Sequence, residues 1–142
     1  MNSLAVNSIS ALAGSVITAA FGKWDQLLWI FLFMIVLDYV TGVLASIKDG
    51  TGLKSEIGFW GLTRKALMLV VIVLAHQLDL LLSGGTDVIK TGAIYFYMSN
   101  ELISITENYG RLGLPMPSKL RKVIAVLQNK DDKDDKDERQ KQ

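Results

Sequence analysis

The sequence predicts an all-α integral membrane protein with three or four transmembrane helices and a disordered, charged C-terminal tail. Half of its 142 residues are apolar and the mean hydropathy is positive, at +0.31, which is typical of the membrane class. Charge is distributed very unevenly, because residues 1–47 hold three charged side chains whereas residues 130–142 hold eleven. The two ends of the chain are therefore suited to different solvents.

The longest apolar segment, residues 27–47, is the first predicted span. Its 21 residues contain one charge, at Asp38, and a helix of that length crosses about 30 Å of hydrocarbon at about 1.5 Å per residue. A soluble protein with apolar core helices is the alternative interpretation. Soluble amphipathic helices, however, carry charges on their outer face every three or four residues, and residues 27–37 carry none on any face. This contrast favours the membrane.

Two further spans follow the first one. The second predicted span, residues 66–82, starts with ten uninterrupted apolar residues before polar ones appear. The third, residues 91–108, is the least apolar, because Asn100 and Glu101 lie near its middle. Only packing against other helices would hold such a segment in lipid.

The N-terminal segment, residues 1–23, differs in kind, because its residues 4–22 are small, uncharged and only mildly hydrophobic. As a helix it would have an apolar side and a smaller, more polar side. It would either lie amphipathically at the membrane interface or insert as a fourth span. The apolar side is formed by Val6, Ile9, Ala13, Val16, Ile17 and Ala20, and the polar side by Asn7, Gly14 and Thr18.

Basic residues in the loops indicate the orientation. They gather in the first connecting loop and after the third span, whereas the opposite side has only Lys23 and Lys90. By the positive-inside rule, the first connecting loop and the C-terminus are cytoplasmic. The N-terminus is then outside if there are three spans, or inside if there are four.

Each predicted span carries polar residues on one helical face. A carboxylate near a span centre costs on the order of 2.5–3.5 kcal/mol, so these residues should not face lipid. In one interpretation they satisfy one another inside a compact bundle. In the other they become the wall of a water-filled opening when several copies associate. The candidate pore-lining or interhelix residues are Asp38, Thr41 and Gly42 in the first span, His76 and Asp79 in the second, and Tyr97, Glu101, Ser104 and Asn108 in the third.

Among these candidates, His76 and Asp79 share a face of the second span. They are candidates for a pH-sensitive pair, although a lone membrane histidine more often makes only a hydrogen bond.

The segment between the first two spans, residues 48–65, contains four glycines and predicts a tight connection along the membrane surface. Aromatic side chains favour the headgroup region, and a basic side chain near anionic lipid contributes about 1 kcal/mol. The candidate lipid-headgroup contacts are Trp60, Arg64 and Lys65.

The chain changes character after the third span. Glycines and prolines between residues 110 and 117 break the helix, and a short helix is expected from Ser118 to Leu127. Residues 128–142 contain no apolar side chain, so they should form a disordered cytoplasmic tail. The transmembrane domain is therefore expected to comprise residues 24–127.

Several classes of chemistry have no support in the sequence. The chain has no cysteine and one histidine, His76, which excludes thiolate chemistry and paired-histidine zinc motifs. It has no phosphate-binding loop, and the aspartates of the tail lack the spacing of a calcium loop. We therefore expect no enzymatic activity, no cofactor or metal, and no nucleic-acid partner.

Four parts of the sequence together resemble the toxin-secretion and phage-lysis holin family (bacteriophage holin family 4). They are Asp38 with Thr41 and Gly42, the segment SEIGFWGLTRK, Asp79, and the segment NELISITENYGRLGLPMPSKL. The similarity covers residues 34–127. Its most specific part looks like the closing signature of the family and consists of Glu101, Ser104, Ile105, Glu107, Asn108, Arg111, Leu112, Gly113, Pro115, Pro117 and Leu120.

The resemblance implies a small multi-pass protein of the bacterial cytoplasmic membrane that associates into homo-oligomers and opens lesions at a set time. Through these lesions an endolysin, which is a cell-wall hydrolase, or in some members a toxin, leaves the cytoplasm. Membrane lipids would be its other partners. The competing function is a small oligomeric channel or scaffold that assists secretion without lysis.

Overall fold

The computed structural model describes residues 2–52, 55–82 and 84–126, so the predicted tail lies outside the described residues. The described part contains no strand and confirms the all-α prediction. A short helix over residues 118–126 follows the four long ones. The long helices are α1 (Ser3–Phe21), α2 (Gln26–Lys48), α3 (Ser55–Leu82) and α4 (Val88–Arg111).

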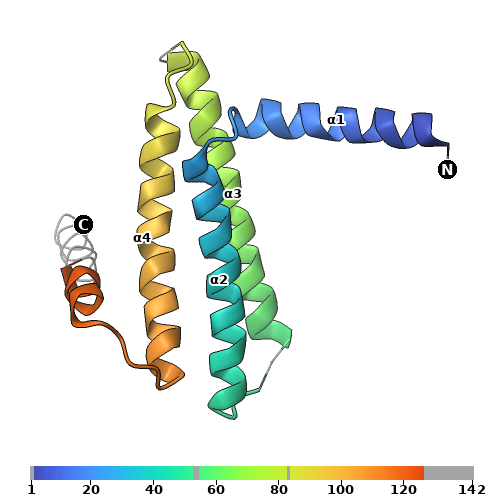
Figure 1. Cartoon of the computed structure of the whole chain (residues 1–142). Helices are drawn as coiled ribbons and strands as arrows, with labels where there is room; N and C mark the ends of the chain where they lie inside the picture. The colour runs from blue at the N-terminus through green and yellow to red at the C-terminus, as the bar shows by residue number, and fades with distance from the viewer. Residues whose placement is uncertain (1, 53–54, 83, 127–142) are drawn as a thin grey trace, which may run out of the picture.

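Helices α2, α3 and α4 form an upright bundle (Figure 1). Helix α4 packs against both α2 and α3, whereas α2 and α3 contact each other far less. The apolar core of the bundle consists of Leu28 and Phe31 from α2, Ile72 from α3 and Ile94 from α4, all fully buried. Helix α4 is therefore the element that holds the other two together.

The outer surface of the bundle is apolar, which is the reverse of a soluble protein. Large apolar side chains such as Phe33 and Val36 on α2 and Leu67 and Leu74 on α3 are more than half exposed, whereas eight polar or charged residues among those described are buried. Helices α1 and α2 and the Gly58–Leu82 part of α3 are long and apolar enough to cross a membrane. This arrangement fits lipid as the surrounding solvent.

Helix α3 corrects the predicted boundary of the second span. We expected a surface connection up to Lys65, but the helix starts at Ser55, so most of that connection is helical. The charges of Arg64 and Lys65 suggested a span end. A charged residue, however, does not interrupt the backbone hydrogen bonds of a helix, and Lys65 finds partners inside the bundle.

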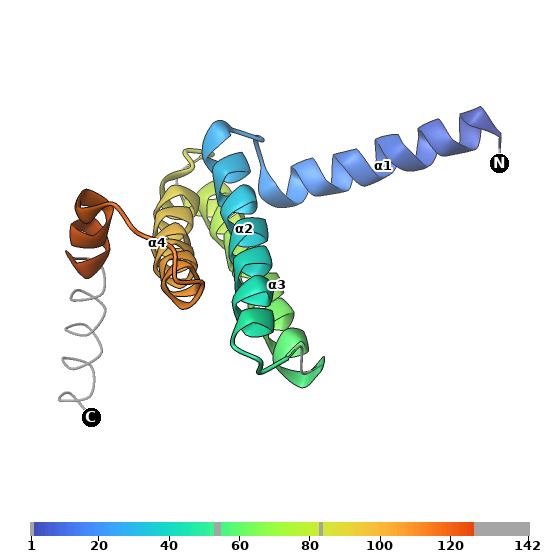
Figure 2. The ribbon, with the colours of Figure 1, turned by 60° about the horizontal axis from the view of Figure 1, so that its bottom comes forward.

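Helix α1 leaves the bundle and runs across its axis, as both ribbon views show (Figures 1 and 2). None of its residues is buried. It is joined to α2 by a short connection, in which the side chain of Asp25 accepts a hydrogen bond of 2.9 Å from Leu28 N and caps α2.

The junction between α1 and the bundle depends on Gly22. This residue has φ 72° and ψ −147°, a conformation that is open almost only to glycine. A Cβ atom at this position would lie 2.3 Å from Cε1 of His76. In addition, Gln77 Nε2 donates to the carbonyl oxygen of Ala19 at 3.2 Å. The C-terminal end of α1 is therefore fixed against α3.

A Gly22→Ala substitution should destabilise the protein by about 1–3 kcal/mol, the usual cost of a strained backbone conformation, with the clash against His76 in addition. Thermal unfolding in detergent, followed by circular dichroism, measures the effect. Gly14→Ala is the matched control, because its added Cβ meets no atom within 4 Å and alanine favours a helix. Equal losses of stability in both variants would contradict the role assigned to Gly22.

Candidate functional site

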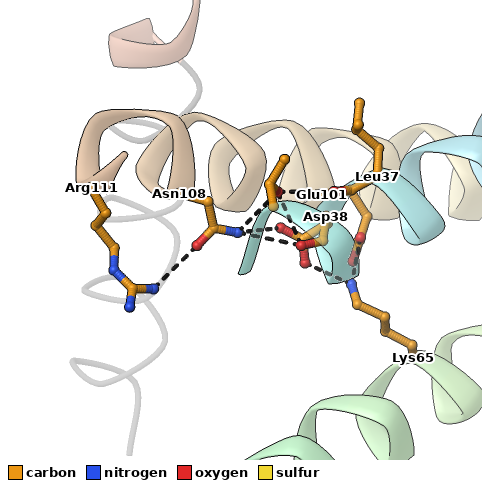
Figure 3. A network of polar contacts seen from close by, with 7 residues as sticks. Leu37, Asp38, Lys65, Glu101, Asn108 and Arg111 are labelled. Carbon is orange, nitrogen blue, oxygen red and sulfur yellow. Dashed lines mark hydrogen bonds and ion pairs between the residues drawn. The ribbon is translucent and has the colours of Figure 1, made fainter. Parts of the chain in front are cut away.

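A lysine bridges the three helices of the bundle. The Nζ atom of Lys65, on α3, lies 2.8 Å from Oδ2 of Asp38 on α2 and 2.6 Å from Oε2 of Glu101 on α4 (Figure 3). All three residues are buried, and Glu101 is only 2% exposed. Because one cation meets two carboxylates, this ion cluster carries a net charge of −1 when all three groups are ionised.

Asn108 extends the ion cluster toward the C-terminal end of α4. Its Nδ2 atom donates to Oδ1 of Asp38 at 3.0 Å and to Oγ1 of Thr41 at 3.4 Å. Gly42 lies beside Asn108, and a Cβ there would be at an ordinary contact distance of 3.4 Å from Asn108 Nδ2. Arg111 then donates to Oδ1 of Asn108 at 3.3 Å (Figure 3). A polar network thus continues from the middle of the bundle to its end.

Helical periodicity explains why these side chains meet. Asp38, Thr41 and Gly42 on α2, and Glu101 and Asn108 on α4, recur at intervals of three, four or seven residues, which keeps them on one face of each helix. Within the residues that the structure describes, no buried side-chain nitrogen or oxygen lacks a hydrogen-bond partner. In this state the polar residues satisfy one another inside a compact bundle.

An open groove of about 660 Å³ lies beside the ion cluster. Residues of α2, α3 and α4 line it, and the weak contact between α2 and α3 leaves room for it. Gly58 and Gly61 line the groove on its α3 side and have no side chains that could fill it. A Cβ added at either position would meet no atom within 4 Å. The other lining residues include the polar or charged Ser46, Asn100, Ser104, Glu107 and Arg64 and the apolar Val43 and Met68, so the groove has a mixed surface.

A second polar cluster closes the opposite end of the bundle. Nδ1 of His76 lies 3.0 Å from Oδ1 of Asp87, and Nζ of Lys90 lies 3.1 Å from Oδ2 of the same carboxylate. Lys90 Nζ also donates to the carbonyl oxygen of Phe21 at 3.3 Å. Partial burial acts to raise the pKa of Asp87, but the hydrogen bonds from Lys90 and His76 outweigh it and lower this pKa below its usual value.

Asp79 caps α4 from outside that helix. Its carboxylate accepts hydrogen bonds from the backbone N–H groups of Ile89 at 2.9 Å and Lys90 at 2.8 Å. These N–H groups belong to the first turn of α4, where no intrahelical acceptor is available and where negative charge is favourable. The proposed pairing of His76 with Asp79 is therefore corrected, since the carboxylate that contacts the His76 ring belongs to Asp87.

Comparison with known proteins places this architecture in a family. The model of the bacteriophage holin family matches residues 15–129, which include the ion cluster, the groove and the short helix. The chain belongs to the bacteriophage holin family. The match reaches further toward the N-terminus than the resemblance seen in residues 34–127 and includes part of α1.

Several relatives of this holin-family protein are similar over most of their length. An uncharacterized 14.9 kDa protein in the nagH 3′ region of Clostridium perfringens is 46% identical over 117 residues, which cover 82% of this chain and 88% of that protein. An uncharacterized protein of Halalkalibacterium halodurans is 39% identical over 84% of this chain and 90% of its own. A probable holin of Bacillus phage phi105 is 29% identical over 72% of this chain and 75% of its own. No solved structure matches.

The structure of this holin-family protein brings together most, but not all, of the predicted residues. Asp38, Thr41 and Asn108 join the network around Glu101, and Ser104 lines the groove. Tyr97 lies elsewhere, because its ring stacks on Phe31 in the apolar core at a centroid distance of 6.4 Å. The polar face of α4 is therefore interrupted at this position.

Lys65 was predicted to contact lipid headgroups, and this prediction is wrong for the described state. The residue is 8% exposed and ion-paired within the bundle, whereas Trp60 and Arg64 are exposed. Two intramembrane carboxylates, Asp38 and Glu101, require a nearby cation. This need for a cation is the feature of the sequence that could have predicted Lys65 as the partner of the two carboxylates.

A Lys65→Met substitution should destabilise the bundle by about 3–5 kcal/mol, because it leaves two buried carboxylates without a cation. Adding Asp38→Asn and Glu101→Gln to this variant should restore much of the stability, since these changes remove the unpaired charges. Thermal unfolding in detergent checks both results. Arg64→Met is the matched control, because this neighbouring cation is exposed and forms no ion pair in the described part of the chain. A Lys65→Met protein as stable as this control would contradict the bridging role.

Proposed function

We propose that this holin-family protein associates into homo-oligomers in the bacterial cytoplasmic membrane and opens lesions that release an endolysin or a toxin. The observation that carries the proposal is the buried ion cluster of Asp38, Lys65 and Glu101 beside the groove. The protein has no catalytic part in this process. Its partners are membrane lipids, further copies of itself and the exported protein.

The buried polar side chains of the bundle support a lesion that is formed by several subunits. The wall of a water-filled opening needs polar side chains, and in the described bundle these face inward while the outer surface is apolar. Three helices enclose too little space for a folded protein. Separation of α2 from α3 would widen the groove and expose the polar side chains in its lining, and these two helices have the weakest mutual contact in the bundle. Several copies arranged side by side would then share a continuous polar wall.

The ion cluster is the element that would have to rearrange. Lys65 is the bridge from α3 to both α2 and α4, so it holds the groove in its present width. A charged cluster is costly in lipid but stable in water. Contact with water in an assembled lesion would therefore stabilise the open arrangement relative to the closed one.

Induced expression in a bacterium tests the proposal. The wild-type protein should produce a lag and then an abrupt loss of membrane potential and growth. Glu101→Leu should still insert but should not permeabilise, because it removes a charged group from the lesion wall. Glu101→Gln is the matched variant, and it should retain part of the activity because it keeps a polar side chain of the same size.

Two outcomes would count against the proposal. Undiminished killing by the Glu101→Leu protein would mean that Glu101 has only a structural role. Steady growth at high expression of the wild-type protein would favour a channel or scaffold that serves secretion without lysis.

We further propose a topology of three spans, with the C-terminus in the cytoplasm and α1 along the outer surface. Two observations support it. The loop end of α2 and the C-terminal end of α4 carry Lys48 and Arg111, and further basic residues follow Arg111, as the positive-inside rule requires. Helix α1 runs across the bundle axis and not along it (Figure 1), although it is apolar enough to span.

Single-cysteine labelling tests this topology cleanly, because the chain contains no cysteine. In intact protoplasts, a membrane-impermeant maleimide should react with Lys23→Cys and Asn2→Cys proteins, but with a Thr51→Cys protein only after permeabilisation. All three positions are exposed. Protection of the Asn2→Cys protein together with the Thr51→Cys protein, while the Lys23→Cys protein still reacts, would show that α1 crosses the membrane as a fourth span. Reaction of the Thr51→Cys protein alone would reverse the orientation.

A further inference from the structure

The short helix over residues 118–126 carries basic charge that no carboxylate of the described residues neutralises. Lys119, Arg121 and Lys122 are exposed, and this helix contains no acidic residue. None of the three forms an ion pair within the described ranges. By contrast, the basic residues Lys65 and Arg111 of the bundle are paired with carboxylates. Within the described part of the chain, these three charges are therefore available to bind an anion.

The same helix has an exposed apolar strip. Leu120, Val123 and Val126 recur every three residues, which places them along one side of a short helix, and they are 40%, 53% and 60% exposed. Ile124 is the inward residue, at 3% exposed. Lys119 and Lys122 lie next to the apolar strip by helical spacing. Apolar residues bordered by basic ones are typical of a helix that lies in the interface of an anionic membrane.

The direction of the helix fits that interface. In Figure 1 the bundle is upright and the 118–126 helix is seen nearly end-on, and in Figure 2 it is seen lengthwise. Its axis therefore crosses that of α4. The turn that allows this begins at Gly113, with φ 70°, and Pro115 and Pro117 prevent a continuation of α4. If α2 and α4 cross the membrane, this helix therefore does not follow their direction through it.

We propose that the 118–126 helix docks on the anionic lipid surface next to the C-terminal end of α4, with Leu120, Val123 and Val126 in the acyl boundary and the basic side chains at the phosphates. Long basic side chains can reach the phosphates while their stems remain in apolar surroundings. This docking depends on insertion of the bundle but not on lesion formation, so a protein that never opens a lesion would still show it.

Labelled full-length protein in vesicles tests the proposal. A Val123→Cys protein, with an environment-sensitive fluorophore on its single cysteine, is reconstituted at a low protein-to-lipid ratio in phosphatidylcholine vesicles with or without phosphatidylglycerol. The label should be shielded from a water-soluble quencher only where phosphatidylglycerol is present, and high salt should reverse the shielding. The same label on an Ala125→Cys protein is the control, because residue 125 lies on the opposite side of the helix and should stay accessible.

Charge removal provides the second part of the test. Combining Lys119→Gln, Arg121→Gln and Lys122→Gln should shift the docking equilibrium by about 100-fold, since each basic residue near an anionic surface contributes about fivefold. Shielding in phosphatidylglycerol vesicles should then be lost. Lys23→Gln removes a cation at the other end of the bundle and should have no effect.

Three results would overturn the proposal. The label could be accessible in both kinds of vesicle, which would place the helix in water. It could be shielded equally in both, which would mean that the protein itself covers the strip. It could be shielded only at high protein density, which would assign the strip to contact with a second copy.

Discussion

Much of this structure depends on the cost of placing charge inside hydrocarbon and on the way in which Lys65 reduces that cost. Asp38 and Glu101 come from two different helices, and each would be unfavourable in lipid alone. The ammonium group of Lys65, from a third helix, lies within 2.8 Å of both. The three residues are thus stable only when α2, α3 and α4 are assembled. In the proposed topology, the same requirement would retain α4 in the membrane, although α4 is not among the helices that are apolar enough to span by composition.

The two ends of the bundle are built differently. At the end near α1, Asp79 caps α4, and the contacts of His76 and Lys90 with Asp87 tie α3 to the start of α4. The apolar core lies in the same half, around Leu28 and Phe31 of the first turns of α2. The other half contains the polar network and the open groove. The bundle is therefore closely packed at one end and hollow at the other, and rearrangement would be easiest at the hollow end.

This division connects the structure with the proposed lesion. A holin must remain harmless as a closed bundle and later provide a polar wall, so it needs polar groups that are satisfied internally at first. The ion cluster meets that condition, because its members form hydrogen bonds within one chain and border a groove that already reaches the surface. The helices that lie across the bundle axis, α1 and the one over residues 118–126, would keep the bundle at a fixed depth between the two membrane surfaces.

The sequence by itself determined the helical membrane class, the positions of α2 and the apolar part of α3, and the inward faces of α2 and α4. These properties depend on hydropathy and on helical periodicity, which are local and can be counted along the chain. Asp38, Thr41, Glu101 and Asn108 were found in this way. The family resemblance was also contained in the sequence and is confirmed by the match over residues 15–129.

Only the tertiary structure decided which polar groups meet. Lys65 lies 27 residues from Asp38 and 36 from Glu101, and His76 lies 11 from Asp87. The members of each pair belong to different helices or to the N-cap of another helix, so the periodicity of one helix does not relate them. The direction of α1 likewise depends on Gly22 and on the side chains of His76 and Gln77 on α3, which contact the C-terminal end of α1. Composition shows how many charged groups of a membrane helix must be shielded from lipid. The partner of each group is determined only when neighbouring helices pack, because ion pairing acts over a few ångströms in space and not along the chain.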